Sequence, residues 1–202
     1  MALAEREVAP QAQRQFYTEE EYLALEEAAE EKSEYVHGGL RPMPGGTDYH
    51  GALAMNLGAA LIAALRGRGC LVMSSDVKVS ASGQMYYPDV SVTCGPREYY
   101  GGNRTVITNP LLVAEVLSPS TEGRDRGEKF HNYLAVNSLA AYLLVSQDAP
   151  RVEQFTRAED GRWSYTLAAG LEGVLDIPAL SVPLSLADIY DGIDFAQQAG
   201  DE

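Results

Sequence analysis

Glu115 is the acidic residue of this chain with the most unusual setting. It interrupts the apolar run 111–117, a continuous stretch typical of a strand that is covered on both faces. A carboxylate there is costly unless it is paired, hydrogen-bonded, protonated or bound to a metal ion. Glu115 is therefore a candidate site residue. The alternative is a glutamate at a strand end that reaches solvent or a neighbouring arginine.

A second acidic residue, Asp89, follows Pro88 at the start of another predicted strand. Pro88 lacks a backbone donor and favours extended geometry in the residue before it, as at a strand entrance or edge. Val90 and Val92 then face one side of the strand, while Asp89 faces the other. Taken alone, a Pro-Asp pair is equally typical of a turn.

Asp89 and Glu115 can converge if their two strands are neighbours. Two carboxylates a few ångströms apart repel each other, and a hard divalent cation such as Mg²⁺ relieves that repulsion through oxygen ligands. Such an ion can lower the pKa of a water molecule and neutralise charge on a phosphoryl group. The pair therefore indicates metal-assisted chemistry on a phosphoester.

Three polar residues follow Glu115 at helical spacing, Asp125, Lys129 and Tyr133. Lys129 and Tyr133 are four residues apart and share a helix face. Two interpretations are open for Lys129. It can form an ordinary surface ion pair with Asp125, or it can lie beside the metal site and orient the water or counter transition-state charge.

Periodicity and turn signals predict the elements that position these residues. We expect helices at 18–32, 48–66, 125–135 and 184–190, strands at 70–74, 76–80, 87–93, 111–117 and 141–145, hairpins around 37–39 and 159–161, and a loop at 95–109. Thr18 with Glu21 forms a capping box, and Asp48 is the expected cap of the second helix. A single α/β domain is predicted for residues 16–192, between a loose tail (1–15) and a polar end (193–202).

Composition excludes several classes of protein. A hydrophobic content of 46% and a charged content of 22% exclude wholesale disorder. The longest apolar run, 59–65, falls far short of the roughly 18 residues that a membrane span needs. No signal peptide is visible, and Cys70 and Cys94 are expected to be core thiols in a reducing compartment. We therefore expect a cytoplasmic protein without a membrane partner.

The formal net charge of −14 argues against a polyanionic partner, because phosphate affinity rests on Lys and Arg. The distribution weakens that argument. Residues 36–135 contain 9 bases and 8 acids, so the excess of acids lies in the two flanking segments. The net charge does not exclude binding to nucleic acid, and no basic patch favours it.

At this point the sequence resembles a known family, the putative restriction endonucleases of the Uma-two type within the PD-(D/E)XK nuclease superfamily. The resemblance covers residues 16–192. It rests on the following motifs in this order: Glu34 before a glycine-containing hairpin, His50 opening a leucine-rich helix, Pro88-Asp89, the run Glu-Val-Leu-Ser-Pro-Ser-Thr at 115–121, and Asp125, Lys129 and Tyr133.

The resemblance implies a restriction-endonuclease-like α/β fold, with a central mixed β-sheet flanked by α-helices, and a metal-dependent endonuclease that hydrolyses phosphodiester bonds in DNA. Mg²⁺, with Mn²⁺ as a possible substitute, is expected on Asp89, Glu115 and the backbone carbonyl of Val116, with Glu34 in the same acidic pocket. The usual superfamily pattern ends Glu-x-Lys. Leu117 replaces that lysine here, and the role passes by resemblance to Lys129. A homodimer is implied as well, since a second active site serves the second strand.

Two other functions stay open. A non-catalytic binding or regulatory domain of the same fold is favoured by the displaced lysine and the charge of −14. A metal-dependent hydrolase of small phosphoesters would need no basic groove. His50 is either a metal ligand or an ordinary polar residue, and Tyr99, Tyr100 and Arg104 either contact nucleic acid or form a disordered or dimer-facing loop.

Overall fold

The computed structural model describes residues 16–195, and its contacts divide the chain into two units, residues 1–43 and 44–202. The predicted tail, 1–15, lies outside the described residues, and so does the predicted polar end from residue 196 onward. The single domain expected over 16–192 stays a prediction.

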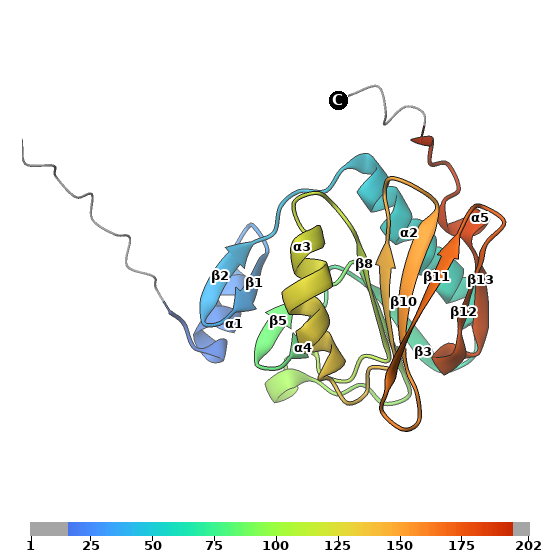
Figure 1. The fold of residues 1–202 in the computed structure, drawn as a ribbon. Coiled ribbons are helices and arrows are strands. Elements are labelled where there is room, and N and C mark those ends of the chain that lie inside the picture. Colours follow the sequence, from blue (N-terminus) through green and yellow to red (C-terminus); the bar gives the residue numbers. More distant parts are fainter. Residues whose placement is uncertain (1–15, 196–202) are drawn as a thin grey trace, which may run out of the picture. The chain divides into compact units, whose positions relative to one another are not determined.

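The first unit consists of helix α1 (Glu19–Ala28) and the hairpin of β1 (Ser33–Val36) and β2 (Gly39–Pro42) (Figure 1). The predicted capping box is confirmed, because Thr18 Oγ1 accepts from the backbone N–H of Glu21 at 3.1 Å and the Glu21 carboxylate accepts from that of Thr18 at 2.8 Å. α1 ends four residues earlier than predicted, where the Glu26 carboxylate accepts from the backbone N–H and the hydroxyl of Ser33. The hairpin predicted around 37–39 is confirmed.

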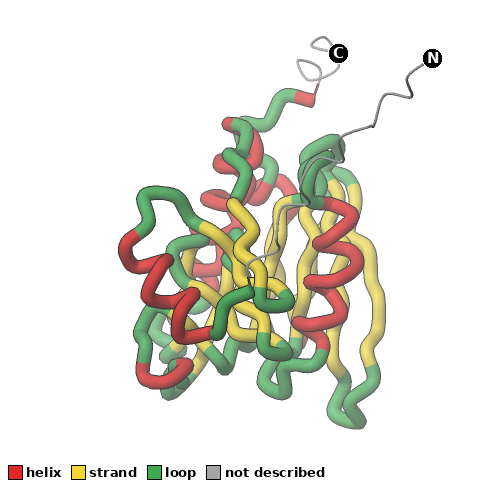
Figure 2. The backbone as a smooth tube through the Cα atoms, turned by 90° about the vertical axis from the view of Figure 1, so that its left-hand side faces the viewer, coloured by secondary structure: helices red, strands yellow, loops and turns green. Residues whose placement is uncertain are grey.

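The second unit is built on a six-stranded sheet in the order β11-β10-β9-β8-β6-β3, in which β8 and β9 are parallel and the other pairs antiparallel (Figure 1). Its strands and helices, in chain order, are α2 (Asp48–Ala64), β3 (Cys70–Ser74), β4 (Lys78–Ala81), β5 (Gln84–Tyr86), β6 (Val90–Cys94), η1 (Tyr100–Gly102), β7 (Val106–Ile107), β8 (Leu112–Val116), α3 (Glu122–Arg124), η2 (Asp125–Lys129), α4 (Phe130–Leu134), β9 (Ala141–Val145), β10 (Arg151–Arg157), β11 (Trp163–Ala169), β12 (Val174–Ile177), η3 (Pro178–Leu180), β13 (Val182–Ser185) and α5 (Leu186–Ile189). Figure 2 shows the strands in yellow running side by side, with the green loops gathered at their ends.

Alternation along the strands gives the sheet two different faces. On one face, Leu53, Leu57 and Leu61 of α2 join the same buried cluster as Val90 of β6 and Ala114 of β8. This confirms the packing stripe predicted for the second helix. The other face is aromatic, with the rings of Phe130, Tyr133, Tyr142 and Phe155 in contact. Helices therefore cover both faces of the sheet strands that carry the candidate site residues.

Several boundaries differ from the predicted ones for local reasons. Thr47, not Asp48, caps α2, because its hydroxyl accepts from the backbone N–H of His50 at 3.1 Å. The strand expected at 87–93 begins only at Val90, after Pro88, and the three residues 84–86 form the separate strand β5. The third helical segment starts at Glu122 and contains the π-helical turn η2, which replaces the uniform α-helix expected at 125–135. The short C-terminal helix is α5, preceded by a hairpin of β12 and β13 that was not predicted.

The expectation of two free thiols is wrong. Cys70 on β3 and Cys94 on β6 are register partners, and the structure joins them in a disulfide. The pairing follows from strand register, since directly opposed residues of an antiparallel pair carry their side chains on the same face. Within residues 16–195, none of the helices is long and apolar enough to cross a membrane.

Candidate active site

The two acidic residues singled out from the sequence lie at the same end of two neighbouring strands. β6 and β8 are antiparallel with Val90 opposite Ala114; Glu115 is the next residue of β8, and Asp89 is the residue just before β6. Ala114 and Val116 belong to the core beneath α2. Glu115, between them, therefore projects from the other face of the sheet. Asp89 accepts a hydrogen bond from the backbone N–H of Val116, the residue after Glu115, so the chain at Asp89 lies beside the end of β8 that carries Glu115.

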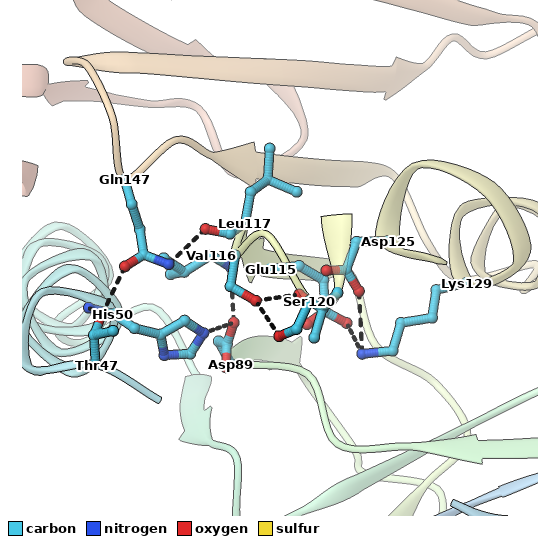
Figure 3. Close-up of polar contacts among 12 residues, drawn as sticks. Thr47, His50, Asp89, Glu115, Val116, Leu117, Ser120, Asp125, Lys129 and Gln147 are labelled. Carbon is cyan, nitrogen blue, oxygen red and sulfur yellow. Dashed lines mark hydrogen bonds and ion pairs between the residues drawn. The ribbon is translucent and has the colours of Figure 1, made fainter. Parts of the chain in front are cut away.

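Asp89 is held from two directions. Its Oδ2 atom accepts a hydrogen bond of 2.7 Å from the backbone N–H of Val116, and the same atom lies 3.3 Å from Nε2 of His50 (Figure 3). The contact with the Asp89 carboxylate raises the pKa of His50 above its ordinary value, against the opposing effect of burial. These contacts orient the carboxylate, and its Oδ1 atom takes part in neither of them.

Glu115 is buried, with 4% of its side chain exposed, and it is not left uncompensated. Its Oε1 atom lies 3.2 Å from Nζ of Lys129 and accepts from the Tyr133 hydroxyl at 3.3 Å. The same Nζ lies 3.3 Å from Oδ1 of Asp125 (Figure 3). The reading of Asp125 and Lys129 as a surface ion pair is therefore wrong, because their side chains are only 2% and 7% exposed.

The π-helical turn η2 places Asp125 and Lys129 on the same side, facing Glu115. Such turns occur frequently at functional sites. Burial raises the pKa of Asp125, and the Lys129 ammonium partly offsets that rise. Burial and the neighbouring carboxylates also hold the pKa of Tyr142 well above its ordinary value. The Tyr142 hydroxyl thus keeps its proton and donates to the backbone carbonyl of Asp125 at 3.0 Å.

Gln147 and Thr47 support the loop that leaves β8, and no motif in the sequence pointed to either residue. Nε2 of Gln147 donates to the carbonyl of Leu117 at 2.6 Å, and Oε1 of Gln147 accepts from the Thr47 hydroxyl at 2.9 Å (Figure 3). Further along the loop, the Ser118 hydroxyl lies 2.9 Å from that of Thr121. These bonds connect the N-terminus of α2, the end of β8 and the second residue after β9.

Arg126 fastens the helical segment that carries Lys129 to the sheet. Its guanidinium group makes two hydrogen bonds to the Glu153 carboxylate on β10, of 2.9 and 2.7 Å, and one of 2.6 Å to Glu122. Paired, planar contacts of this kind are among the stronger ion pairs in proteins. The Arg126 guanidinium lowers the pKa of Glu153 below its ordinary value of 4.5.

Glu153→Gln is expected to reduce the free energy of unfolding at pH 7 by about 1–2 kcal/mol. Because the folded-state pKa lies below the unfolded one, the contribution of Glu153 is complete above the unfolded value of 4.5 and is lost as the pH falls through the lowered pKa. Urea unfolding of both proteins from pH 7 down to pH 3 checks this. A stability difference that is independent of pH would contradict the assignment.

Glu34 lies on β1 in the first unit. Its place in the acidic pocket stays a prediction. In the loop predicted at 95–109, Arg104 lies over the ring of Tyr99, with 5.6 Å between its guanidinium carbon and the ring centroid. Part of that loop is ordered as η1 and β7, and β7 pairs in parallel with β4.

The donor set at the site fits a hard divalent cation. Two carboxylates, Asp89 and Glu115, and the backbone carbonyl of Val116 offer oxygen ligands only, as Mg²⁺ or Mn²⁺ prefers. Within the described part of the chain, no three His, Cys, Asp or Glu side chains are grouped so that they could hold a metal. Mg²⁺ is commonly held by one or two carboxylates together with water and substrate phosphate, so a two-carboxylate set is compatible with it.

Known proteins are similar to this chain in sequence and in fold. The Uma2 family, described as "Putative restriction endonuclease", matches residues 19–187. Two uncharacterized proteins of Synechocystis sp., slr1290 and sll1609, are 37% and 33% identical over 178 and 167 residues, which is 87% and 82% of this chain and 92% and 94% of theirs. The crystal structure of a putative nuclease belonging to DUF820 from Anabaena variabilis aligns with a TM-score of 0.69 at 19% identity, over 86% of this chain and 97% of that one. The predicted restriction-endonuclease-like fold is confirmed.

Proposed function

The chain belongs to the Uma2 family of putative restriction endonucleases, and we propose that it is a Mg²⁺-dependent endonuclease that hydrolyses phosphodiester bonds in DNA. The observation that carries this proposal is that the Asp89 carboxylate accepts from the backbone N–H of Val116, next to Glu115 on β8, while the buried Lys129 ammonium lies 3.2 Å from Glu115. Phosphoryl transfer is assisted by oxygen ligands that hold a metal ion and by a nearby cationic side chain that stabilises the charge on the phosphoryl group.

Different residues would have separate roles in the proposed reaction. Asp89, Glu115 and the Val116 carbonyl would hold Mg²⁺ or Mn²⁺. The bound ion supplies Lewis acidity, which neutralises charge on the phosphoryl oxygens and makes a water molecule more acidic. Hydrolysis joins the water oxygen to phosphorus, breaks one P–O ester bond and transfers a proton to the leaving oxygen.

Lys129 would position the attacking water and counter the charge that grows in the transition state. Its ammonium group already has two carboxylate neighbours, Glu115 and Asp125, which fix its place. Tyr133 donates to the oxygen of Glu115 that faces Lys129 and so limits the rotation of that carboxylate. Lys129 of η2 thus takes the role of the lysine that is absent at position 117. This favours catalysis over a non-catalytic module of the same fold.

Cleavage assays on a substrate panel test this function. We expect supercoiled plasmid and DNA oligonucleotides to be cut with Mg²⁺ or Mn²⁺ and left intact in EDTA. Activity on a small phosphodiester without any cleavage of DNA would select the small-phosphoester hydrolase. A folded protein that cuts nothing in the panel, RNA included, would leave the non-catalytic alternative in place.

His50 is a positioning residue in this account, since it contacts the metal-binding Asp89. Loss of such a supporting partner commonly costs 10–100-fold in metal affinity or activity. We expect His50→Gln to lower the cleavage rate by about 10–100-fold and to raise the Mg²⁺ concentration needed for half-maximal rate. His131→Gln, an exposed histidine on α4, is the matched control and should behave as the wild type. An unchanged Mg²⁺ dependence in His50→Gln would remove His50 from the site.

We propose further that the protein acts in the cytoplasm as a homodimer, in which the second site cuts the second strand. Sedimentation equilibrium measures the oligomeric state directly, and a monomer at micromolar concentration would contradict it. Thiol titration of protein isolated from the cytoplasm measures whether Cys70 and Cys94 are joined there as they are in the structure.

A further inference from the structure

A cavity of about 540 Å³ opens from the candidate active site between α2 and β3, the edge strand of the six-stranded sheet. His50 and Asp89 line it on the side of the active site. Met55, Gly58 and Ile62 of α2 form one wall, and Val72 of β3 contributes to the other. These α2 residues are distinct from the leucines that pack on the sheet, and the inner lining of the cavity, with Val90 and Val72, borders the core.

The chemistry of the lining limits what the cavity can hold. His50 and Asp89 are its only titratable lining residues among those described, and the rest of the lining consists of glycine, alanine, serine, methionine, valine and isoleucine. The described lining contains no lysine or arginine, so a phosphate group would meet no permanently charged cation in the cavity. An uncharged, flat group with apolar faces fits better, and a methionine thioether makes favourable contacts with aromatic rings.

We propose that this cavity binds the nucleoside next to the scissile phosphate, unstacked from its neighbours. The proposal rests on the proposed function, because it takes the phosphate to lie at Asp89 and Glu115. The nucleoside attached to that phosphate must then lie beside Asp89, where the cavity begins. A volume of about 540 Å³ is within the usual range of small-molecule sites and leaves room for a base with its sugar.

The proposal fixes the class of substrate. A base that is stacked in a regular duplex cannot enter a side cavity unless it is first extruded, and extrusion is easiest where the base is unpaired. Single-stranded DNA, or duplex DNA with a mismatch at the cleavage point, is therefore expected to be cut faster than fully paired DNA. Apolar contact with the faces of a base does not read the pattern of donors and acceptors on its edges, so little preference among the four bases is expected.

Gly58→Leu is the variant that fills the cavity without strain. Apart from its chain neighbours and the backbone of its own helix, a Cβ atom added at Gly58 meets no heavy atom within 4 Å, and leucine is a better helix former than glycine. Ala63→Leu adds a side chain of the same type to an exposed position of α2 outside the cavity and is the matched control. Neither residue belongs to the catalytic machinery.

The probe is a single-stranded DNA tetranucleotide with 2-aminopurine beside the central of its three internucleotide phosphates, titrated with each protein in Ca²⁺ and followed by fluorescence. We expect Gly58→Leu to weaken binding about ten-fold, because the leucine side chain occupies the space of the nucleoside, and to raise KM for cleavage in Mg²⁺ by a similar factor. Ala63→Leu should match the wild type in both measurements.

Each contrary outcome has a distinct meaning. Equal probe binding and equal KM in Gly58→Leu and wild type would overturn the cavity proposal and leave the nuclease proposal standing. Failure of the wild type to bind the probe would overturn it too. A changed sedimentation coefficient in Gly58→Leu with unchanged probe binding would assign the cavity to contact with a second copy of the chain. Weakened probe binding in Gly58→Leu without any cleavage by the wild type would retain the cavity as a nucleoside site and refute the nuclease.

Discussion

Asp89→Asn is expected to lower the rate of Mg²⁺-dependent DNA cleavage by about 1,000-fold, a loss typical of removing one catalytic electrostatic partner. Asparagine keeps the size of the side chain and an oxygen that can accept from the Val116 backbone N–H, the 2.7 Å bond of the native protein. It removes the negative charge that a divalent cation needs. The change therefore affects cation binding far more than folding. Single-turnover cleavage at saturating Mg²⁺ measures the effect.

Asp76→Asn is the matched control for this variant. Asp76 is also an acidic residue just before a strand, and its Oδ2 atom accepts locally from the Ser74 hydroxyl at 3.2 Å. We expect Asp76→Asn to cut DNA at the wild-type rate. Full activity in Asp89→Asn, with a circular dichroism spectrum and melting temperature like those of the wild type, would take Asp89 out of the mechanism.

Lys129→Met is expected to abolish cleavage and to destabilise the fold by about 3–5 kcal/mol, the usual cost of removing one partner from a buried ion pair. Methionine fills a similar volume but leaves the Glu115 and Asp125 carboxylates without the ammonium group between them. The loss should grow with pH. In the native protein, burial raises the pKa of Asp125 and the Lys129 ammonium opposes that rise. Without the ammonium, the folded variant would keep a proton on Asp125 at pH values above about 3.8, where the unfolded chain has released it, so its stability falls as the pH rises.

A second substitution separates stability from catalysis at Lys129. Adding Asp125→Asn to Lys129→Met removes one of the two uncompensated charges, so much of the lost stability should return while cleavage stays absent. Urea unfolding at pH 5 and pH 8 and the plasmid assay give both readouts. Wild-type stability in Lys129→Met at pH 8 would contradict the buried arrangement, and wild-type cleavage would contradict the proposed role.

Much of this arrangement follows from local pattern. The apolar runs predicted β3 and β9 with the observed bounds, and the four-residue leucine spacing identified the face of α2 that packs on the sheet. A glutamate within an apolar strand pointed to Glu115 because a buried charge demands a partner. The antiparallel pairing of β6 with β8 then brings Asp89, the residue before β6, beside the end of β8 that carries Glu115.

Other features depend on contacts between distant segments. The spacing of Asp125 and Lys129 suits an exposed α-helix as well as a buried π turn, and only packing against Glu115 separates the two. Gln147 is a single glutamine after a strand, and its bonds join residues that the sequence separates widely. The disulfide likewise depends on the β3–β6 register, which neither cysteine reveals alone.

The central claim is that Asp89 and Glu115 together bind a divalent cation. Calorimetric titration with Mn²⁺ of the wild type and of Glu115→Gln tests it without any assumption about substrate. We expect a defined binding step for the wild type and an affinity weakened by at least about 100-fold in Glu115→Gln, since even the loss of a supporting group costs 10–100-fold. Equal affinity in the two proteins would show that Glu115 is not a ligand and would contradict the account.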